Sequence, residues 1–169
     1  LKRMARKNTP KSFAELVASA KSNIPDVAIT TDVIVGFPGE TEEEFAKSIA
    51  YVKEMGFASG HVFTYSEREG TTAARMKGHV HNFTRKERSQ QMREVFAASE
   101  MDFRQKYLGS QMEVLWESQK IQENGEFLAR GLTGNYLPVQ IFSKNALWNQ
   151  ISTVKLVRME GGRILAEVL

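Results

Sequence analysis

The chain has 169 residues, of which 41% are hydrophobic and 25% are charged, so it can bury a core and is neither disordered nor fibrous. No apolar run of about 18 residues could cross a bilayer and the start lacks a signal peptide, so we expect a soluble cytoplasmic protein with no membrane partner. The absence of cysteine excludes disulfides and any thiolate-bound zinc ion or iron–sulfur cluster made by this chain alone.

The net charge of +3 is unevenly distributed along the chain. Basic side chains gather in two stretches, Lys2, Arg3, Arg6, Lys7 and Lys11 at the start, and Arg75, Lys77, Arg85, Lys86, Arg88 and Arg93 in the middle. Such clusters can meet phosphates, although solvated helix faces have the same composition. Residues 111–169 hold six basic and six acidic side chains and therefore predict no electrostatic funnel for RNA.

The first part of the chain alternates helical and strand patterns. In chain order they predict a helix over residues 10–22, a strand over 27–36, a helix over 42–55 and a strand over 60–65. Thr9 followed by proline is a helix start, Thr41 opens a capping box, and Gly56 is a helix stop. This order with short connections is typical of a parallel α/β sheet or barrel.

A longer helix follows, and then the pattern changes. A second capping box at Thr84 predicts the start of a helix whose apolar side continues to Tyr107, with Gly109 as its stop. Beyond it lie five short β-rich runs, at residues 112–116, 127–132, 136–142, 151–157 and 163–168. Short strands at this spacing predict a small closed or partly open barrel, and we place the domain boundary near residue 109.

Ligands of parallel α/β proteins bind at the carboxyl ends of the strands, which here are the segments 32–40 and 63–71. Gly36 and Gly39 can bring backbone close to a ligand, and the following helix presents free N–H groups. Turn geometry alone would also explain these glycines. The loop lacks the Lys and Ser/Thr of a phosphate-binding Walker loop.

Three ordered motifs give a specific resemblance. They are the run of residues 1–6 (LKRMAR) with Thr9, the run 31–41 (TDVIVGFPGET), and the run 63–66 (FTYS) with Arg68, Gly70, Thr71 and Ala73. Together they resemble the methylthiotransferase family of radical S-adenosylmethionine enzymes. The resemblance implies that residues 1–108 are the C-terminal part of a partial TIM-like radical S-adenosylmethionine barrel and that residues 109–169 are a TRAM domain, a small OB-like all-β barrel that holds RNA.

Within this family the chain is most similar to the MtaB type, through residues 56–63 and 131–139. That type adds a methylthio group to C2 of N6-threonylcarbamoyladenosine at position 37, in the anticodon stem-loop of tRNA. The resemblance implies S-adenosylmethionine and two 4Fe–4S clusters in the full-length enzyme. Because the cluster cysteines are absent here, we expect a fragment that is inactive alone, contains no catalytic residue and works with the N-terminal remainder of the same enzyme.

The resemblance also assigns cofactor-binding residues. Ile34 and Val35 match the strand that packs on the adenine, Gly36 offers close backbone approach and Asp32 a polar contact. On the next strand, Phe63 and Tyr65 match a second adenine-contacting position. Alternatively, the apolar residues Ile34, Val35 and Phe63 could simply pack in the core of the barrel without contacting a cofactor.

Predicted RNA contacts are the basic residues Arg6, Arg68, Arg85, Lys86, Arg88 and Arg130 and the aromatic residue Tyr136. Glu67 and Glu69 flank Arg68, and their negative charge weakens the prediction that Arg68 contacts an RNA phosphate. In the barrel, Tyr136, Phe142 and Trp148 could stack bases, whereas core positions are expected for Trp116, Phe127 and Phe142.

His61, His79 and His81 form no recognisable metal set, and no hydroxyl has a base and an orienting acid in evident arrangement, so we expect neither a metal site nor nucleophilic hydrolysis. Two other functions stay open. One is methylthiolation of an aspartate on a ribosomal protein, against which the run 133–139 argues. The other is an RNA-binding module without catalysis.

Overall fold

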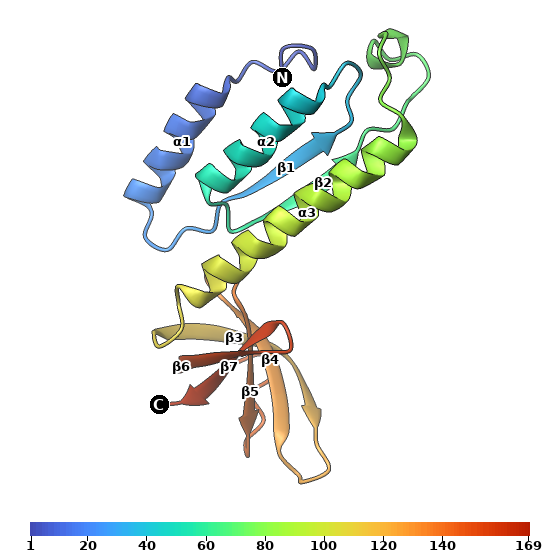
Figure 1. The fold of residues 1–169 in the computed structure, drawn as a ribbon. Helices are drawn as coiled ribbons and strands as arrows, with labels where there is room; N and C mark the ends of the chain where they lie inside the picture. Colours follow the sequence, from blue (N-terminus) through green and yellow to red (C-terminus); the bar gives the residue numbers. More distant parts are fainter. The chain divides into compact units, whose positions relative to one another are not determined.

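A computed structural model describes residues 1–169, which form two compact units, Leu1–Met101 and Asp102–Leu169 (Figure 1). The first unit combines helices with a parallel sheet and the second is a closed all-β barrel, so the expected fold class is confirmed. None of the helices is long and apolar enough to span a membrane.

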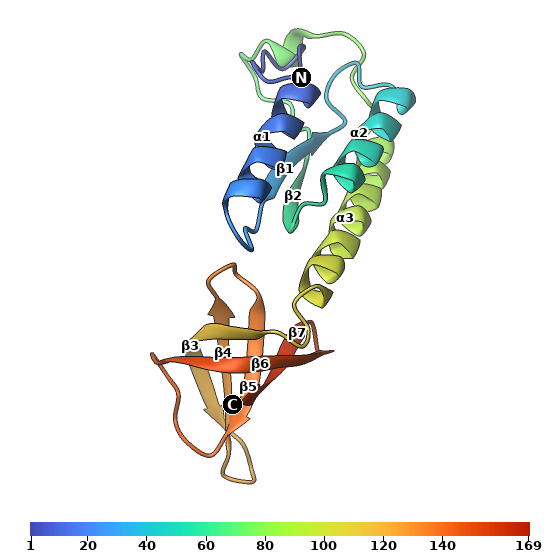
Figure 2. The ribbon, with the colours of Figure 1, turned by 90° about the vertical axis from the view of Figure 1, so that its left-hand side faces the viewer.

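The first unit consists of α1 (Pro10–Asn23), β1 (Thr30–Val35), α2 (Glu42–Met55), β2 (Ser59–Thr64), the 3-10 turn η1 (Ala73–Arg75) and most of α3 (Asn82–Gln105) (Figure 2). β1 and β2 are parallel, with Asp32 opposite His61 and Ile34 opposite Phe63. One core joins the helices to one face of this sheet, and its buried members are Val17, Val35, Phe45, Val52, Phe57, Met92 and Phe96. α3 approaches β2 so closely that a Cβ on Gly60 would lie 2.2 Å from the ring of Phe96.

Local capping chemistry explains where the first helices begin and end. Thr9 is the expected N-cap of α1 and also forms a capping box with Ser12, Thr41 forms the expected capping box of α2, and Gly56 ends α2 in the left-handed conformation with φ 56°. The predicted long helix is present as α3, but its predicted bounds were wrong, because it begins at Asn82, so that Thr84 lies inside it, and it ends at Gln105, before Gly109. His81 takes the capping role instead, since its ring Nδ1 accepts a hydrogen bond from the N–H of Phe83 at 3.3 Å.

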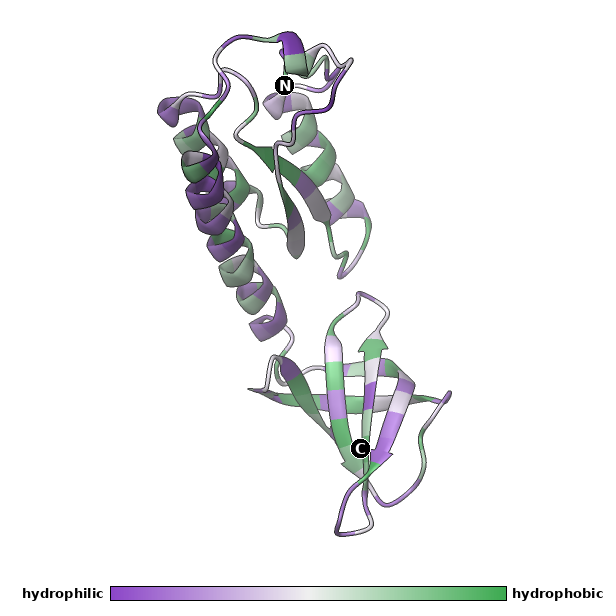
Figure 3. Ribbon diagram, turned by 90° about the vertical axis from the view of Figure 1, so that its right-hand side faces the viewer, coloured by the Kyte–Doolittle hydropathy of each residue, from purple (hydrophilic) through white to green (hydrophobic).

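The second unit contains β3 (Gln111–Ile121), β4 (Phe127–Thr133), β5 (Pro138–Ser143), β6 (Ile151–Glu160) and β7 (Arg163–Val168). They close in the order β3-β4-β5-β7-β6, antiparallel except for the β5–β7 pair. Irregularities in β3 near Trp116 and in β6 near Leu156 bend the strands. Hydrophobic and polar residues alternate along the barrel strands (Figure 3), as expected when every strand has one inward face.

The barrel is filled by apolar side chains. Trp116 is completely buried, and its indole N–H donates to the hydroxyl of Ser152 at 2.7 Å. Gly131 is required opposite it, because a Cβ there would lie 2.1 Å from the carbonyl oxygen of Leu115. The expectation of a core position is confirmed for Trp116 but was wrong for Phe142, which is 46% exposed because it lies on the outward side of β5.

The end of α3 packs with the barrel. Phe103 and Tyr107 contact each other edge to face and adjoin the barrel core. Gly109, with φ 85°, then turns the chain, and its N–H donates to the carbonyl of Leu156 at 2.7 Å. For this reason the compact units divide at Asp102, although the regular strands begin only at Gln111.

Candidate functional site

The loop from Gly36 to Glu40, which follows β1, is a self-contained turn. Gly36 and Gly39 have φ values of 72° and 78°, which other residues rarely adopt. The N–H of Glu40 donates to the carbonyl of Phe37 at 2.9 Å, and its carboxylate accepts from the N–H of Gly36, also at 2.9 Å. The loop thus folds back on the strand that it leaves.

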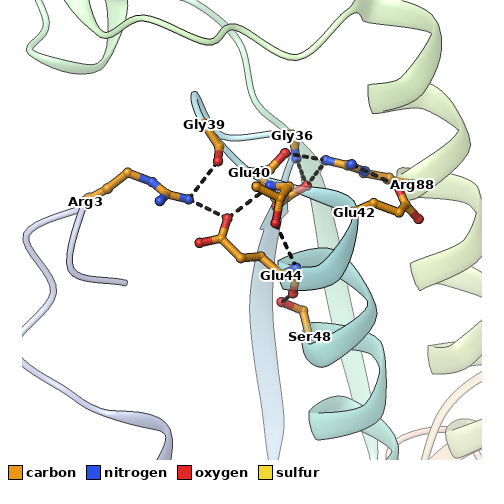
Figure 4. Close-up of polar contacts among 9 residues, drawn as sticks. Arg3, Gly36, Gly39, Glu40, Glu42, Glu44, Ser48 and Arg88 are labelled. Atoms are coloured by element: carbon orange, nitrogen blue, oxygen red, sulfur yellow. Dashed lines mark hydrogen bonds and ion pairs between the residues drawn. The ribbon is translucent and has the colours of Figure 1, made fainter.

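Arg88 of α3 holds this loop from one side (Figure 4). Its guanidinium donates to the carboxylate of Glu40 at 2.7 Å, to the Glu40 carbonyl at 3.0 Å and to the carboxylate of Glu42 at 2.9 Å. The side chains of Arg88 and Glu40 are only 6% and 13% exposed, and the guanidinium also lies over the ring of Phe45. A phosphate contact by Arg88 would have to break a buried ion pair, so its position indicates a structural role.

Arg3 holds the loop from the other side (Figure 4). Its guanidinium donates to the Gly39 carbonyl at 3.1 Å and to the carboxylate of Glu44 at 2.7 Å. The hydrogen bond from Arg3 lowers the pKa of Glu44 below its ordinary value, and the hydrogen bond from the backbone N–H of Thr41 lowers it further by a smaller amount. The contact with Glu44 raises the pKa of Arg3. Two arginines that are distant in sequence therefore fix one short loop.

The end of β2 is tied to the same place. The N–H of Tyr65 donates to the Val35 carbonyl at 2.9 Å, and the ring of Tyr65 meets that of Phe37 edge to face. Arg85 of α3 donates to the Tyr65 carbonyl at 2.7 Å, and its side chain crosses over Gly36 so closely that a Cβ there would lie 2.3 Å from the Arg85 Cγ. Arg85 thus joins the two strand ends.

The sheet has one covered and one open face. Val35 points into the helix-covered core and is 1% exposed. On the opposite face Phe63 is 51% exposed, Ile34 is partly exposed, and the Asp32 side chain is 70% exposed. The structure therefore brings Asp32, Ile34 and Phe63 together, whereas a ligand on this face could not reach Val35.

The predicted RNA contacts fall into three groups. Arg6, Arg68 and Lys86 are exposed and make no ion pair, whereas Arg85 and Arg88 have the internal partners described above. In the barrel unit, Arg130 and Tyr136 are also exposed; Arg130 lies on the outer side of β4, and Tyr136 is 77% exposed in the turn after β4.

Sequence reasoning missed the polar ties of Arg3 and Arg88 and the contact between His61 and Asp32. One signal was present for Arg88. It precedes Met92 and Phe96 at intervals of four residues, which places it on the buried side of α3. No comparable local pattern marks Arg3 or His61. No three His, Asp or Glu side chains gather in a way that could hold a metal ion.

Comparison with known proteins gives relatives over essentially the whole chain, and no family model matches it. A tRNA-2-methylthio-N(6)-dimethylallyladenosine synthase of Bacillus cereus is 37% identical over 169 residues, which is 100% of this chain and 33% of the relative. The same kind of synthase from Acetivibrio thermocellus is 37% identical over 95% of the chain and 34% of the relative. The threonylcarbamoyladenosine tRNA methylthiotransferase MtaB of Bacillus subtilis is 36% identical over 94% of the chain and 35% of the relative. The chain spans about a third of the length of these relatives.

Proposed function

Because this chain belongs to the methylthiotransferase family of radical S-adenosylmethionine enzymes, we propose that it works within an enzyme that adds a methylthio group to an adenosine of tRNA. The observation that carries this proposal is similarity along the entire chain to proteins named for that reaction. It acts in the cytoplasm together with the N-terminal remainder of the enzyme. The two units correspond to the end of the catalytic barrel and to a TRAM domain.

The finer proposal is that the substrate is N6-threonylcarbamoyladenosine at position 37, in the anticodon stem-loop, modified at C2. The runs 56–63 and 131–139, which resemble the MtaB type, support it. Overall identity favours neither substrate, since the MtaB relative and the dimethylallyladenosine synthases are 36% and 37% identical to the chain. The proposal of N6-threonylcarbamoyladenosine over the dimethylallyl nucleoside therefore depends on the resemblance of residues 56–63 and 131–139 to the MtaB type.

The open face of the sheet suits the adenosine end of S-adenosylmethionine. Ile34 and Phe63 offer an apolar surface, whereas Gly36 is buried beneath the side chain of Arg85. When bound in this family, S-adenosylmethionine supplies the radical that activates the substrate. The contribution of this chain is to pack against the nucleoside and to hold the loop Gly36–Glu40 rigid through Arg3, Arg85 and Arg88.

The two 4Fe–4S clusters implied by the family find no thiolate ligand here, since the chain has no cysteine. Their ligands must come from other residues of the full-length enzyme. We therefore propose that this chain alone binds substrate or cofactor but is inactive.

For tRNA we propose contacts from the exposed side chains Arg6, Arg68 and Lys86 in the first unit and from Arg130 and Tyr136 in the barrel. The arginines suit phosphate oxygens and Tyr136 suits an unpaired base. Binding should weaken as salt rises, because each phosphate contact releases counterions.

The test is mass spectrometry of tRNA nucleosides from cells with and without the gene that encodes this chain. We expect deletion to remove 2-methylthio-N6-threonylcarbamoyladenosine and to leave its precursor in place. Loss of the 2-methylthio-N6-dimethylallyl nucleoside instead would support the enzyme class and overturn the finer substrate. If tRNA is unchanged but a ribosomal protein loses a methylthio-aspartate, the tRNA function is wrong.

A further inference from the structure

Asp32 and His61 form a polar couple on the open face of the sheet. They are direct neighbours across the β1–β2 pairing, and Nδ1 of His61 lies 3.2 Å from Oδ1 of Asp32. Both side chains are largely exposed, at 70% for Asp32 and 75% for His61. No other polar side chain holds either of them, so each orients the other.

The contact fixes the hydrogen-bonding pattern of the imidazole. An ionised carboxylate only accepts hydrogen bonds, so Nδ1 of His61 must carry the proton that is donated to Asp32. In the neutral ring Nε2 is then an acceptor. The couple therefore presents one oriented acceptor to whatever lies on this face.

An apolar surface lies next to Asp32 and His61, toward the carboxyl ends of β1 and β2. Ile34 and Phe63 are the next cross-strand pair on the same face, and the rings of His61 and Phe63 lie 6.5 Å apart at 45°. Phe63 is 51% exposed. An apolar surface with an oriented acceptor at its margin suits a purine nucleoside, which combines an aromatic ring with ribose hydroxyl donors.

The fold gains little from this couple. A hydrogen bond between two side chains as exposed as these contributes little to stability. His61 and Asp32 also lie outside the buried core of the unit. The chemistry of the couple and of the adjacent aromatic side chain therefore suits a ligand better than it suits the stability of this unit.

We propose that His61, oriented by Asp32, accepts a hydrogen bond from a purine nucleoside that lies on Ile34 and Phe63. This inference rests on the proposed function, which supplies two adenosines: that of S-adenosylmethionine and that of the tRNA substrate. Both carry a purine ring and a ribose 2′-hydroxyl donor. His61 is a positioning residue for one of them, and the test below identifies which.

The experiment measures two dissociation constants for the full-length protein, one with S-adenosylhomocysteine and one with unmodified tRNA. It compares wild type with His61→Leu, which removes the acceptor, and His61→Gln, whose amide oxygen can replace it. We expect His61→Leu to raise one of the two constants roughly threefold to tenfold, the range for loss of one hydrogen bond. His61→Gln should restore most of the affinity.

The constant that rises identifies the source of the nucleoside. Two constants within twofold of wild type in His61→Leu would overturn the proposal. Gln91→Leu is the control, since Gln91 is an exposed neutral polar side chain on α3, outside the sheet. Because binding needs no turnover, a protein that fails to modify tRNA would defeat the proposed function while the dissociation constants still decide the role of His61.

A second measurement does not depend on folding of a leucine variant. Nitrogen NMR of the wild-type protein should show His61 with its proton on Nδ1 at neutral pH, and Asp32→Asn should weaken that preference. A proton on Nε2 in the wild type would contradict the oriented acceptor.

Discussion

The two units of this chain are stabilised in different ways. The barrel has no free strand edge, its core is apolar, and its Arg158–Glu160 ion pair is exposed. The first unit has a two-stranded sheet with an unpaired edge on each strand, and arginine side chains hold its strand-end loops. Apolar packing therefore holds the closed barrel, whereas polar contacts from arginine side chains hold the loops at the candidate site.

The two units can be followed separately in one sample. Both tryptophans, Trp116 and Trp148, lie in the barrel, so their fluorescence reports on the barrel alone. The helical circular dichroism signal reports mainly on the first unit, which contains α1, α2 and most of α3. Each variant below should therefore change one signal and leave the other near wild type.

The largest effect is expected for Trp116→Ala in the barrel. The substitution leaves a cavity in a fully buried position and removes the hydrogen bond to Ser152, so we expect a loss of about 3–5 kcal/mol in the free energy of unfolding. Urea titration followed by the fluorescence of Trp148 measures it. Trp148→Ala, at a position 65% exposed, is the control and should cost less than about 0.5 kcal/mol. Similar losses in both variants would show that the barrel core is not the source of its stability.

Arg88→Met should destabilise the first unit by about 3 kcal/mol, because it leaves the poorly exposed carboxylate of Glu40 without its cation. Urea titration followed by circular dichroism at the helical minimum is the measurement. The control is Glu42→Gln, since that side chain is 81% exposed and its ion pair with Arg88 should contribute less than about 1 kcal/mol. If the two variants lower the free energy of unfolding equally, the buried ion pair between Arg88 and Glu40 is not the main contact that holds the loop.

The glycine at the site gives a third test. Gly36→Ala combines a positive φ with a collision against Arg85, and we expect a cost of about 2–3 kcal/mol. Gly70→Ala is the matched control, because Gly70 has a similar φ of 80° but nothing within 4 Å of the added Cβ, so strain alone costs about 1 kcal/mol. Circular dichroism during urea titration measures both. Equal costs would mean that Arg85 moves aside freely.

Local signals predicted the parts of the fold that depend on neighbouring residues. The N-cap at Thr9, the capping box at Thr41 and the stop at Gly56 are made by groups within one helical turn, so they could be identified from the sequence. The start of α3 was misplaced because a histidine, His81, supplies the cap. Phe142 was misplaced because its size suggested the core, whereas the period of two along β5 turns it outward.

The candidate site was only partly predictable. Its location followed from the rule for strand ends, and Asp32, Ile34 and Phe63 do share one open face. The contacts that fix it join residues far apart in the chain, such as Arg88 and Glu40 at a separation of 48 residues. Charge counting could not distinguish such an internal arginine from an exposed one, whereas its helical spacing from Met92 could have done so.

The smallest effect concerns pH. Arg3 lowers the pKa of Glu44 in the folded state, so this contact stabilises the protein fully above the ordinary carboxylate pKa of 4.5 and is lost as pH falls through the lower folded value. Both side chains are nearly half exposed, so solvent screening keeps the effect at or below about 1 kcal/mol. Arg3→Ala should therefore lower the free energy of unfolding near neutral pH and converge with wild type in acid. Arg6→Ala, which removes an exposed arginine that has no ion pair, should give a curve parallel to wild type. A constant difference between Arg3→Ala and wild type at every pH would mean that Arg3 acts through the Gly39 carbonyl and not through Glu44.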